Sequence, residues 1–159
     1  MKAFLFVIAV GILVGLAWPS GRSSAPTAAA VSTAAGQGDE PRETVLERSD
    51  GGHFYAHVEV NGELVRFLVD TGATGVALTE RDAERIGLQF DRRSYEQVGV
   101  GASGPVRGKF VTLAKVSLDG KAAHNLEGAI LEGSDMSLLG QDYLGRFSVE
   151  MRGDTMRIY

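Results

Sequence analysis

The chain has 159 residues, of which 44% are hydrophobic and 23% charged, so it has room for one globular domain with extensions. Its formal net charge of −4 argues against a nucleic-acid-binding protein, which needs a basic face. Without cysteine, the chain has no disulfide, thiolate nucleophile or cysteine-ligated zinc. His53 and His57 share one face of a predicted strand, but no nearby acid completes a metal site, so we expect neither metal nor cofactor.

Residues 1–18 have the pattern of a membrane or targeting segment, because Lys2 is followed by an apolar run that ends at Trp18. A small-x-small cleavage site is poorly formed after this run, since Pro26 follows the nearest small residues. We therefore expect a retained single-pass anchor, with a cleaved signal peptide as the alternative. The positive charge of Lys2 favours a cytoplasmic N-terminus and a periplasmic or other extracytoplasmic domain.

Residues 19–48 are rich in proline, glycine, alanine, serine and threonine, and large apolar side chains are absent from most of this range. Such a segment buries too little surface to offset its ordering entropy, which predicts a flexible linker. We expect the folded domain to span residues 49–159.

The first half of the domain contains a predicted hairpin and a helix. Apolar runs at residues 54–60 and 64–69 flank Asn61-Gly62, a strong signal for a tight hairpin turn. After an apolar run at residues 76–78, Thr79 has the position of a helix N-cap, and Gly87 that of the glycine that follows a helix.

The second half is predicted to be mostly strand. Strands at residues 95–100 and 106–118 flank a glycine-rich tip, and Asp119-Gly120 predicts a tight turn into a strand at 122–131. A helical turn at 141–144 and a closing hairpin at 147–159 complete the chain. We expect an all-β fold, a small closed barrel with one short helix and a C-terminal helical turn.

Residues 67–74, with the sequence FLVDTGAT, place an acid at the end of an apolar strand. A carboxylate in such a dry position is costly unless it is hydrogen-bonded or used, and Gly72 allows a sharp turn and a close approach. By itself the Asp-Thr-Gly tripeptide favours an ordinary turn, in which Asp and Gly are simply turn residues.

This stretch, together with Leu138-Leu139-Gly140 before the helical turn, resembles the retropepsin-like aspartic proteases. The Asn-Gly hairpin, the glycine-rich tip and the domain length also fit, and the resemblance covers residues 49–159. More narrowly, the chain looks like the bacterial single-domain members of this family, which have an N-terminal membrane segment. The resemblance implies a retropepsin fold and aspartic endopeptidase activity on a peptide or protein substrate.

The resemblance also implies a role for each residue of the motifs. Asp70 would be catalytic, Thr71 would brace two active loops against each other, and Gly140 would pack beneath the loop. Gly72 and Ala73 would offer backbone groups to the substrate, and Thr74 would help to support the active-site loop. The glycine-rich tip, formed by Gly101, Ala102, Ser103 and Gly104, would be a flap that covers the peptide.

Because the chain holds one Asp-Thr-Gly and this chemistry needs two carboxyls that share a proton, the resemblance implies a homodimer with Asp70 from each copy. Two departures bear on that dimer: retroviral enzymes usually carry an acid where Thr74 stands and an arginine where Gln141 stands. Dimerisation must then rest on other contacts. The alternatives are a non-catalytic peptide-binding module of the same fold and an envelope protein in which Asp-Thr-Gly is only a turn.

Overall fold

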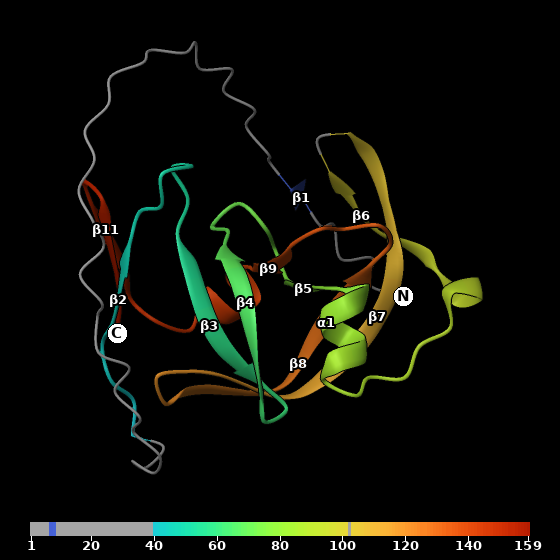
Figure 1. Cartoon of the computed structure of the whole chain (residues 1–159), viewed down its shortest axis with the longest axis horizontal. Coiled ribbons are helices and arrows are strands. Elements are labelled where there is room, and N and C mark those ends of the chain that lie inside the picture. The colour runs from blue at the N-terminus through green and yellow to red at the C-terminus, as the bar shows by residue number, and fades with distance from the viewer. Residues whose placement is uncertain (1–6, 9–39, 102) are drawn as a thin grey trace, which may run out of the picture.

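The computed structural model describes residues 7–8, 40–101 and 103–159, which form eleven strands, two α-helices and one 3₁₀ helix (Figure 1). The strands are β1 (Val7–Ile8), β2 (Thr44–Glu47), β3 (Tyr55–Val60), β4 (Glu63–Val69), β5 (Val76–Thr79), β6 (Glu96–Gly101), β7 (Gly104–Leu118), β8 (Lys121–Leu131), β9 (Ser137–Leu139), β10 (Val149–Arg152) and β11 (Thr155–Ile158). The helices are α1 (Glu80–Arg85), η1 (Arg92–Ser94) and α2 (Gln141–Leu144).

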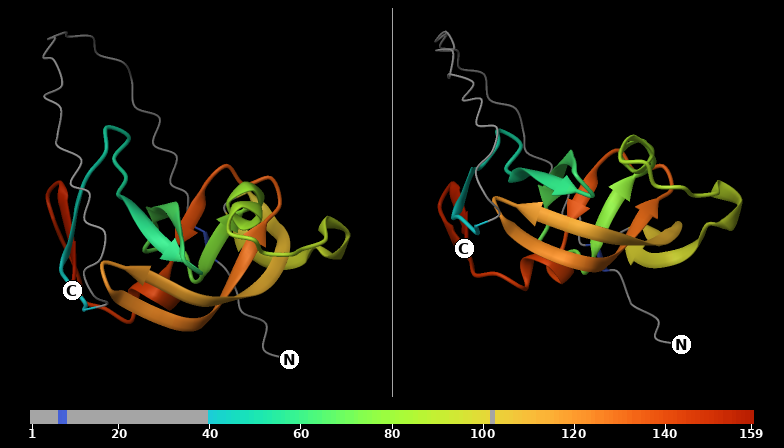
Figure 2. Two further views of the ribbon diagram at one scale, coloured as in Figure 1. Left: turned by 60° about the horizontal axis from the view of Figure 1, so that its bottom comes forward. Right: turned by 90° about the horizontal axis from the view of Figure 1, so that it is seen from below.

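Six strands close into a barrel in the order β7, β3, β4, β9, β5, β8, and β8 pairs back with β7. The long hairpin of β7 and β8, orange in Figure 2, runs across one side of this barrel. Neighbours β4 and β9 are parallel, as are β5 and β8, whereas the other barrel pairs are antiparallel. The predicted all-β closed barrel with two short helical elements is therefore confirmed, and η1 is an addition that the sequence analysis missed.

Two glycine-containing turns set the register of the barrel hairpins. Asn61 and Gly62 have φ angles of 52° and 94°, and Asp119 and Gly120 have φ angles of 50° and 78°. Left-handed backbone at both central residues defines the turn that matches the twist of paired strands, and asparagine, aspartate and glycine tolerate it best. Both predicted turns are confirmed.

Helix α1 begins and ends as its sequence predicts. The Thr79 side chain accepts a hydrogen bond of 3.0 Å from the Asp82 backbone N–H, and Gly87 adopts a φ of 78° just after the helix. Leu88 N–H reaches back to the Ala83 carbonyl at 2.9 Å, which closes the last turn. These caps orient α1 so that Asp82 and Ala83 face the barrel, where both are buried.

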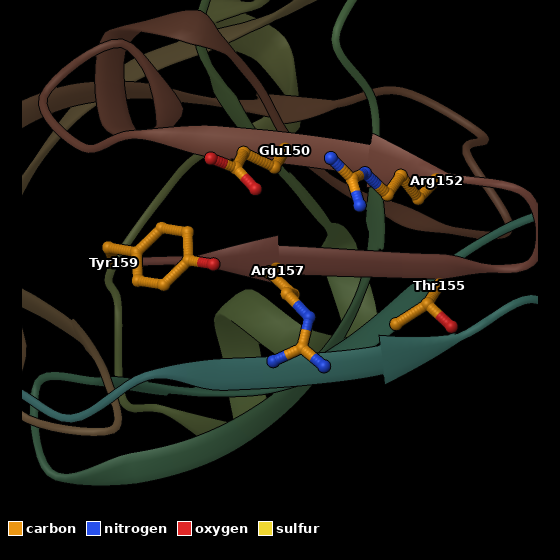
Figure 3. Close-up of a pocket in the computed structure, with 5 residues that line it drawn as sticks. All are labelled: Glu150, Arg152, Thr155, Arg157 and Tyr159. Carbon is orange, nitrogen blue, oxygen red and sulfur yellow. The ribbon is translucent and has the colours of Figure 1, made fainter.

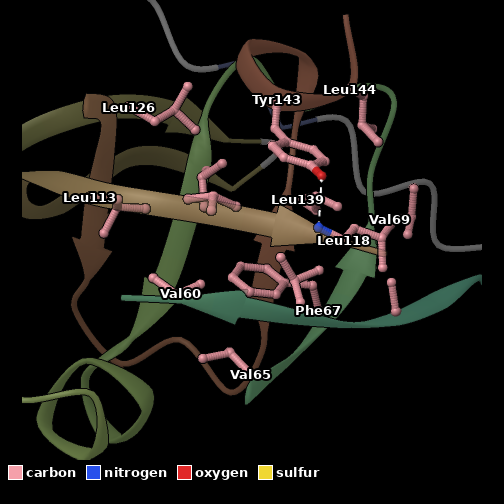
Figure 4. Close-up of a cluster of buried hydrophobic side chains, with 14 of the residues drawn as sticks. Val60, Val65, Phe67, Val69, Leu113, Leu118, Leu126, Leu139, Tyr143 and Leu144 are labelled. Carbon is pink, nitrogen blue, oxygen red and sulfur yellow. Dashed lines mark hydrogen bonds between the residues drawn. The ribbon is translucent and has the colours of Figure 1, made fainter. Parts of the chain in front are cut away.

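The main hydrophobic core fills the barrel and extends to α2, as Figure 4 shows. Phe67 and Leu139 come from neighbouring strands β4 and β9, and Tyr143 of α2 is fully buried beside them. The Tyr143 hydroxyl accepts a hydrogen bond of 3.0 Å from Leu118 N–H and donates one of 2.5 Å to the Lys121 carbonyl. This buried hydroxyl therefore joins α2 to the turn between β7 and β8.

A smaller apolar cluster lies on the other face of the same strands and carries the base of the β6–β7 hairpin. Val98 of β6 and Val106 of β7 pack in one cluster with Leu68 and Leu138. Leu68 and Leu138 stand two residues before Asp70 and Gly140. The hairpin that the sequence analysis called a flap is thus anchored on the strands that lead to the two motifs.

The C-terminal hairpin forms a separate three-stranded sheet in the order β10, β11, β2, which stands at the left of Figure 1. Alternate residues share its outer face, which holds a shallow hollow of about 340 Å³. Figure 3 shows the side chains that line it. The hollow is lined by Glu150, Arg152, Thr155, Arg157 and Tyr159. None of these residues belongs to the Asp70 loop or to the β6–β7 hairpin.

Strand β2 corrects the predicted end of the linker at residue 48. Leu46 pairs with Met156, and Thr44 is buried, with its hydroxyl 2.6 Å from an Asp119 carboxylate oxygen. The fully buried Lys121 donates to Thr44 Oγ1 at 2.9 Å and to the Arg42 carbonyl. Residues 44–47 therefore belong to the folded domain, because their partners stand more than 70 residues later in the chain.

The predicted anchor, residues 1–18, lies outside the described residues except for β1, which pairs with Val100 and Gly101 of β6 in parallel. Within the described ranges, no helix is long and apolar enough to cross a membrane. The membrane segment remains a prediction.

Candidate active site

Asp70 follows the last residue of β4 and stands half-buried at the start of a tight turn. One carboxylate oxygen, Oδ1, accepts a hydrogen bond of 2.9 Å from Gly72 N–H, and the Asp70 carbonyl accepts one of 3.2 Å from Ala73 N–H. Thr71 and Gly72 are exposed, whereas Ala73 is buried. The turn therefore holds the carboxylate in one orientation while its neighbours remain at the surface.

Four hydrogen bonds tie this loop to the segment that ends β9 and begins α2. Asp70 N–H donates to the Leu139 carbonyl at 3.0 Å. Backbone N–H groups of Gln141 and Asp142 donate to the carbonyls of Ala73 and Thr74 at 2.9 and 2.7 Å. The Gln141 side chain supplies the fourth bond, from Nε2 to the Thr71 carbonyl at 2.9 Å. The loop is thus fixed along its length by a segment almost 70 residues away.

Gly140 is buried directly beneath the loop. A Cβ at this position would lie 2.7 Å from the Ala73 carbonyl oxygen and closer still to that of Gly75. No side chain larger than hydrogen fits such a distance without a backbone shift. The close approach of the Ala73 and Gly75 carbonyls therefore gives a steric reason for glycine at position 140.

Gln141 is the site residue that the sequence analysis noted only as a departure from the retroviral pattern. Its backbone and its side chain each donate one hydrogen bond to the Asp70 loop, as given above. A polar residue directly after the packed glycine, at the first position of a short helix, was the available signal. The side-chain contact spans 70 residues of sequence and is visible only in the folded chain.

The predicted flap is a tight hairpin at the ends of β6 and β7. Gly101 pairs with Gly104, whose φ of 114° is left-handed, and Ser103 at the tip is exposed. Ala102 lies outside the described residues. A register shift between Gln97 and Gly99 marks a bulge at the base of the hairpin.

The acidic residues around the loop differ in their surroundings. Burial raises the pKa of the Asp142 carboxyl above its usual range, and the positive charge of Arg146 offsets that rise only in part. Asp82 is held by α1 and accepts a hydrogen bond of 2.7 Å from Ser137, at the start of β9. In the part of the chain that the structure describes, no cluster of three or more histidine and acidic side chains is placed to bind a metal ion.

Comparison with known proteins decides the family. The family described as "gag-polyprotein putative aspartyl protease" matches residues 56–146, more than half of the chain. The chain belongs to this family. The matched range contains both strand ends described above, with Asp70 and Gly140.

A solved structure agrees with this aspartyl protease assignment in both sequence and fold. The crystal structure of a retropepsin-like aspartic protease from Rickettsia conorii is 33% identical, with a TM-score of 0.63. The match covers 75% of this chain and 90% of that one. The retropepsin fold expected from the sequence is thereby confirmed.

Two relatives known from sequence are similar over more than two thirds of this chain. An uncharacterised protein of Rickettsia prowazekii (strain Madrid E) is 36% identical over 109 residues, which are 68% of this chain and 47% of that protein. A protein from the cobV 5′ region of a Sinorhizobium species is 32% identical over 120 residues, 74% of this chain and 52% of that protein. The chain thus spans about half the length of these relatives.

Proposed function

We propose that this member of the aspartyl protease family is an aspartic endopeptidase in which Asp70 activates the attacking water. The observation that carries the proposal is the Asp70 loop itself. A half-buried carboxylate is oriented by Gly72 N–H, and its loop is bound to the β9–α2 segment by four hydrogen bonds. Such fixed geometry is what general acid–base catalysis needs, since the reacting groups must be placed before proton transfer occurs.

The reaction requires two carboxyls about 3 Å apart that share one proton, since both cannot ionise at that distance. The ionised carboxylate takes a proton from water as the water oxygen attacks the peptide carbonyl carbon. The protonated carboxyl gives its proton to the carbonyl oxygen, which forms a tetrahedral intermediate. The first carboxyl then gives the proton that it took from water to the amide nitrogen, while the other carboxylate takes a hydroxyl proton from the intermediate. The C–N bond breaks, the C=O bond reforms, and the amine product leaves with the shared proton restored to the pair.

We infer that the second carboxyl is Asp70 of a second copy, so that the active enzyme is a homodimer. The sequence contains a single Asp-Thr-Gly, and a two-fold axis brings identical groups together. The exposure of Thr71 beside Asp70 supports this arrangement, because it leaves that side chain accessible to a partner loop. The β6–β7 hairpin of each copy would close over an extended peptide.

We also propose that residues 1–18 anchor the enzyme in a membrane, with the catalytic domain on the extracytoplasmic side. The apolar run after Lys2 supports this placement. Confinement to a membrane raises the effective concentration of the two copies, which would offset a weak dimer contact.

The test is cleavage of a mixed peptide library by the full chain in liposomes, for the wild type and Asp70→Asn. We expect activity that rises more steeply than linearly with protein density, disappears in the variant and follows a bell-shaped pH profile with an acidic to neutral optimum. Activity that is retained by Asp70→Asn, or unchanged from pH 4 to 9, would refute the shared-proton mechanism. Peptide binding without any cleavage by the wild type would instead identify a binding module.

A further inference from the structure

A second hollow of about 340 Å³ lies where α1, β3, β4 and the start of β9 meet. It is distinct from the hollow on the C-terminal sheet, and three arginines line it together with an aromatic ring. The residues that matter for its chemistry are Tyr55, Arg66, Arg81, Arg85, Asp135 and Met136.

One of the three arginines is already committed to the fold. Arg85 donates to the Leu64 carbonyl at 2.7 Å and to an Asp82 carboxylate oxygen at 3.2 Å. Asp82 is buried and also accepts the Ser137 hydroxyl at 2.7 Å. Arg85 and Asp82 thus form a neutral pair in the wall of the hollow.

The other two arginines are available to a ligand. The central guanidinium carbon of Arg66, Cζ, lies over the Tyr55 ring, 3.9 Å from its centre, and Arg81 is exposed on α1. Among the described residues, neither guanidinium lies within ion-pair distance of a carboxylate. With Asp135 as the remaining acid, the hollow carries one net positive charge, in a chain whose own net charge is −4.

The hollow lies close to the candidate active site along β9. Met136 and Ser137 line the hollow, and the carbonyl of Leu139, two residues after Ser137, accepts a hydrogen bond from the Asp70 N–H. At about 3.3 Å per strand residue, the two ends are roughly 7–10 Å apart. A peptide bound at Asp70 would need only a few more residues to reach the hollow.

We propose that this hollow is an exosite that binds an acidic side chain of the peptide substrate, several residues from the bond that is cut. Two guanidinium groups match the planar, two-oxygen geometry of a carboxylate. One carboxylate neutralises the single net positive charge of the hollow, whereas a doubly charged phosphate would leave one negative charge uncompensated there. The inference rests on the proposed function for the identity of the ligand as a substrate, and it defines the substrate class.

The first experiment compares the cleavage preferences of the wild type and Arg66→Gln/Arg81→Gln, both as the full chain in detergent. In a mixed peptide library, we expect the wild type to favour substrates with aspartate or glutamate at a fixed distance from the cut. In the double variant, the ratio of cleavage of acidic to non-acidic substrates should fall by about fivefold, which is the scale of two solvent-exposed ion pairs. Arg93→Gln/Arg152→Gln, which removes two exposed arginines elsewhere, is the matched control and should keep it.

The second experiment measures binding without cleavage, in the Asp70→Asn background. Fluorescein-labelled (Ala-Glu)₃ should bind at least fivefold more tightly than labelled (Ala-Gln)₃, as followed by fluorescence anisotropy. That difference should vanish when Arg66→Gln/Arg81→Gln is added, and Arg81→Gln alone should reduce it. The single variant removes no contact made within the fold, so its effect is separable from unfolding.

The outcomes separate the exosite from the protease. Acidic-peptide binding that depends on both arginines, with no cleavage by the wild type, would support the exosite and refute the proposed function. Cleavage by the wild type without acidic preference, together with equal binding of the two peptides, would refute the exosite and leave the protease. Acidic preference that survives the double variant would also overturn the exosite, since another surface would then supply it.

Discussion

The two strand ends at the candidate active site have similar sequences but different roles. β4 and β9 are parallel neighbours, paired at Leu68 and Leu138: β4 leads into the Asp70 turn, and at the same end of the barrel β9 leads into Gly140, the N-cap residue of α2. At the end of β4, Asp70 is half-buried and Thr71 is exposed, whereas Gly140 at the end of β9 is completely enclosed. One end therefore presents polar groups, and the other is closed against it.

The difference shows how a small barrel can hold an acidic side chain in one orientation without fully burying it. The β9–α2 segment donates three of the four hydrogen bonds to the Asp70 loop, and its glycine lets the two backbones touch. The Asp70 carboxylate and the segment that supports its loop are thus nearly 70 residues apart in the chain. Substitutions at the β4 end should change activity, and those at the β9 end should change stability first.

The largest expected effect is that of Asp70→Asn on activity. Loss of a positioned acid–base group should lower kcat by about 10²–10⁴-fold. Asparagine keeps an oxygen that can accept from Gly72 N–H, so the thermal midpoint should change little. Peptide cleavage and thermal unfolding of the same preparations check both halves. A large loss of stability would show that the carboxylate is structural, which would break the division between the two ends.

The next largest effect is that of Gly140→Ala on stability. A methyl group 2.7 Å from the Ala73 carbonyl oxygen must displace the backbone, at a cost of about 1–3 kcal/mol. Denaturant unfolding measures the loss, and activity should fall with it as the Asp70 loop shifts. Gly51→Ala is the control, because the Gly51 backbone is not left-handed and an added methyl group would make only ordinary contacts, the shortest 3.7 Å to His53 Cδ2. The control should therefore lose much less stability than Gly140→Ala, and equal losses would show that the clash beneath the Asp70 loop is not the cause.

Gln141→Leu should have a smaller effect that reveals the link between the two ends. It removes the hydrogen bond to the Thr71 carbonyl while approximately keeping side-chain volume, and should cost about 0.5–1.5 kcal/mol. If that bond positions the loop, kcat should fall while KM stays nearly constant. Gln89→Leu, at an exposed loop position, is the matched control. An unchanged kcat in Gln141→Leu would show that the Gln141 side chain contributes to stability and not to the positioning of the Asp70 loop.

The smallest effect concerns pH and the buried Asp82, which joins α1 to the start of β9. Burial alone would raise the pKa of Asp82, but hydrogen bonds from Ser137, Arg85 and Thr79, with the Arg85 charge, outweigh it and lower the pKa below its usual value. A lowered pKa in the folded state stabilises the protein above the unfolded pKa, about 3.9, and this contribution disappears as pH falls through the folded value.

Unfolding by urea between pH 3 and 7 tests this linkage. Wild-type stability should decline as the pH falls below about 4, and Asp82→Asn should be less stable at pH 7 with a shallower decline. The exposed Asp50→Asn is the control and should follow the wild type. An identical acid slope in Asp82→Asn would show that other carboxylates carry the acid sensitivity.

Local chemistry in the sequence predicted much of the barrel. The Asn61-Gly62 and Asp119-Gly120 turns need left-handed backbone that these residues tolerate, and the Thr79 cap acts within one helical turn. The position of Asp70 after a buried strand is also local, so the candidate site and the fold class were both visible. These features depend on residues at most a few positions apart.

Only the tertiary structure decided the contacts between distant segments. Residues 44–47 look like linker because their partners are distant in the chain: their backbone pairs with β11, more than 100 residues later, and the buried Thr44 side chain bonds to Asp119 and Lys121. The Gln141 amide finds the Thr71 carbonyl across 70 residues, and Arg66 joins Arg81 in one hollow only because α1 packs beside β4. Sequence pattern encodes each element's own preferences, whereas hydrogen bonds and charges shared between elements depend on how the barrel closes.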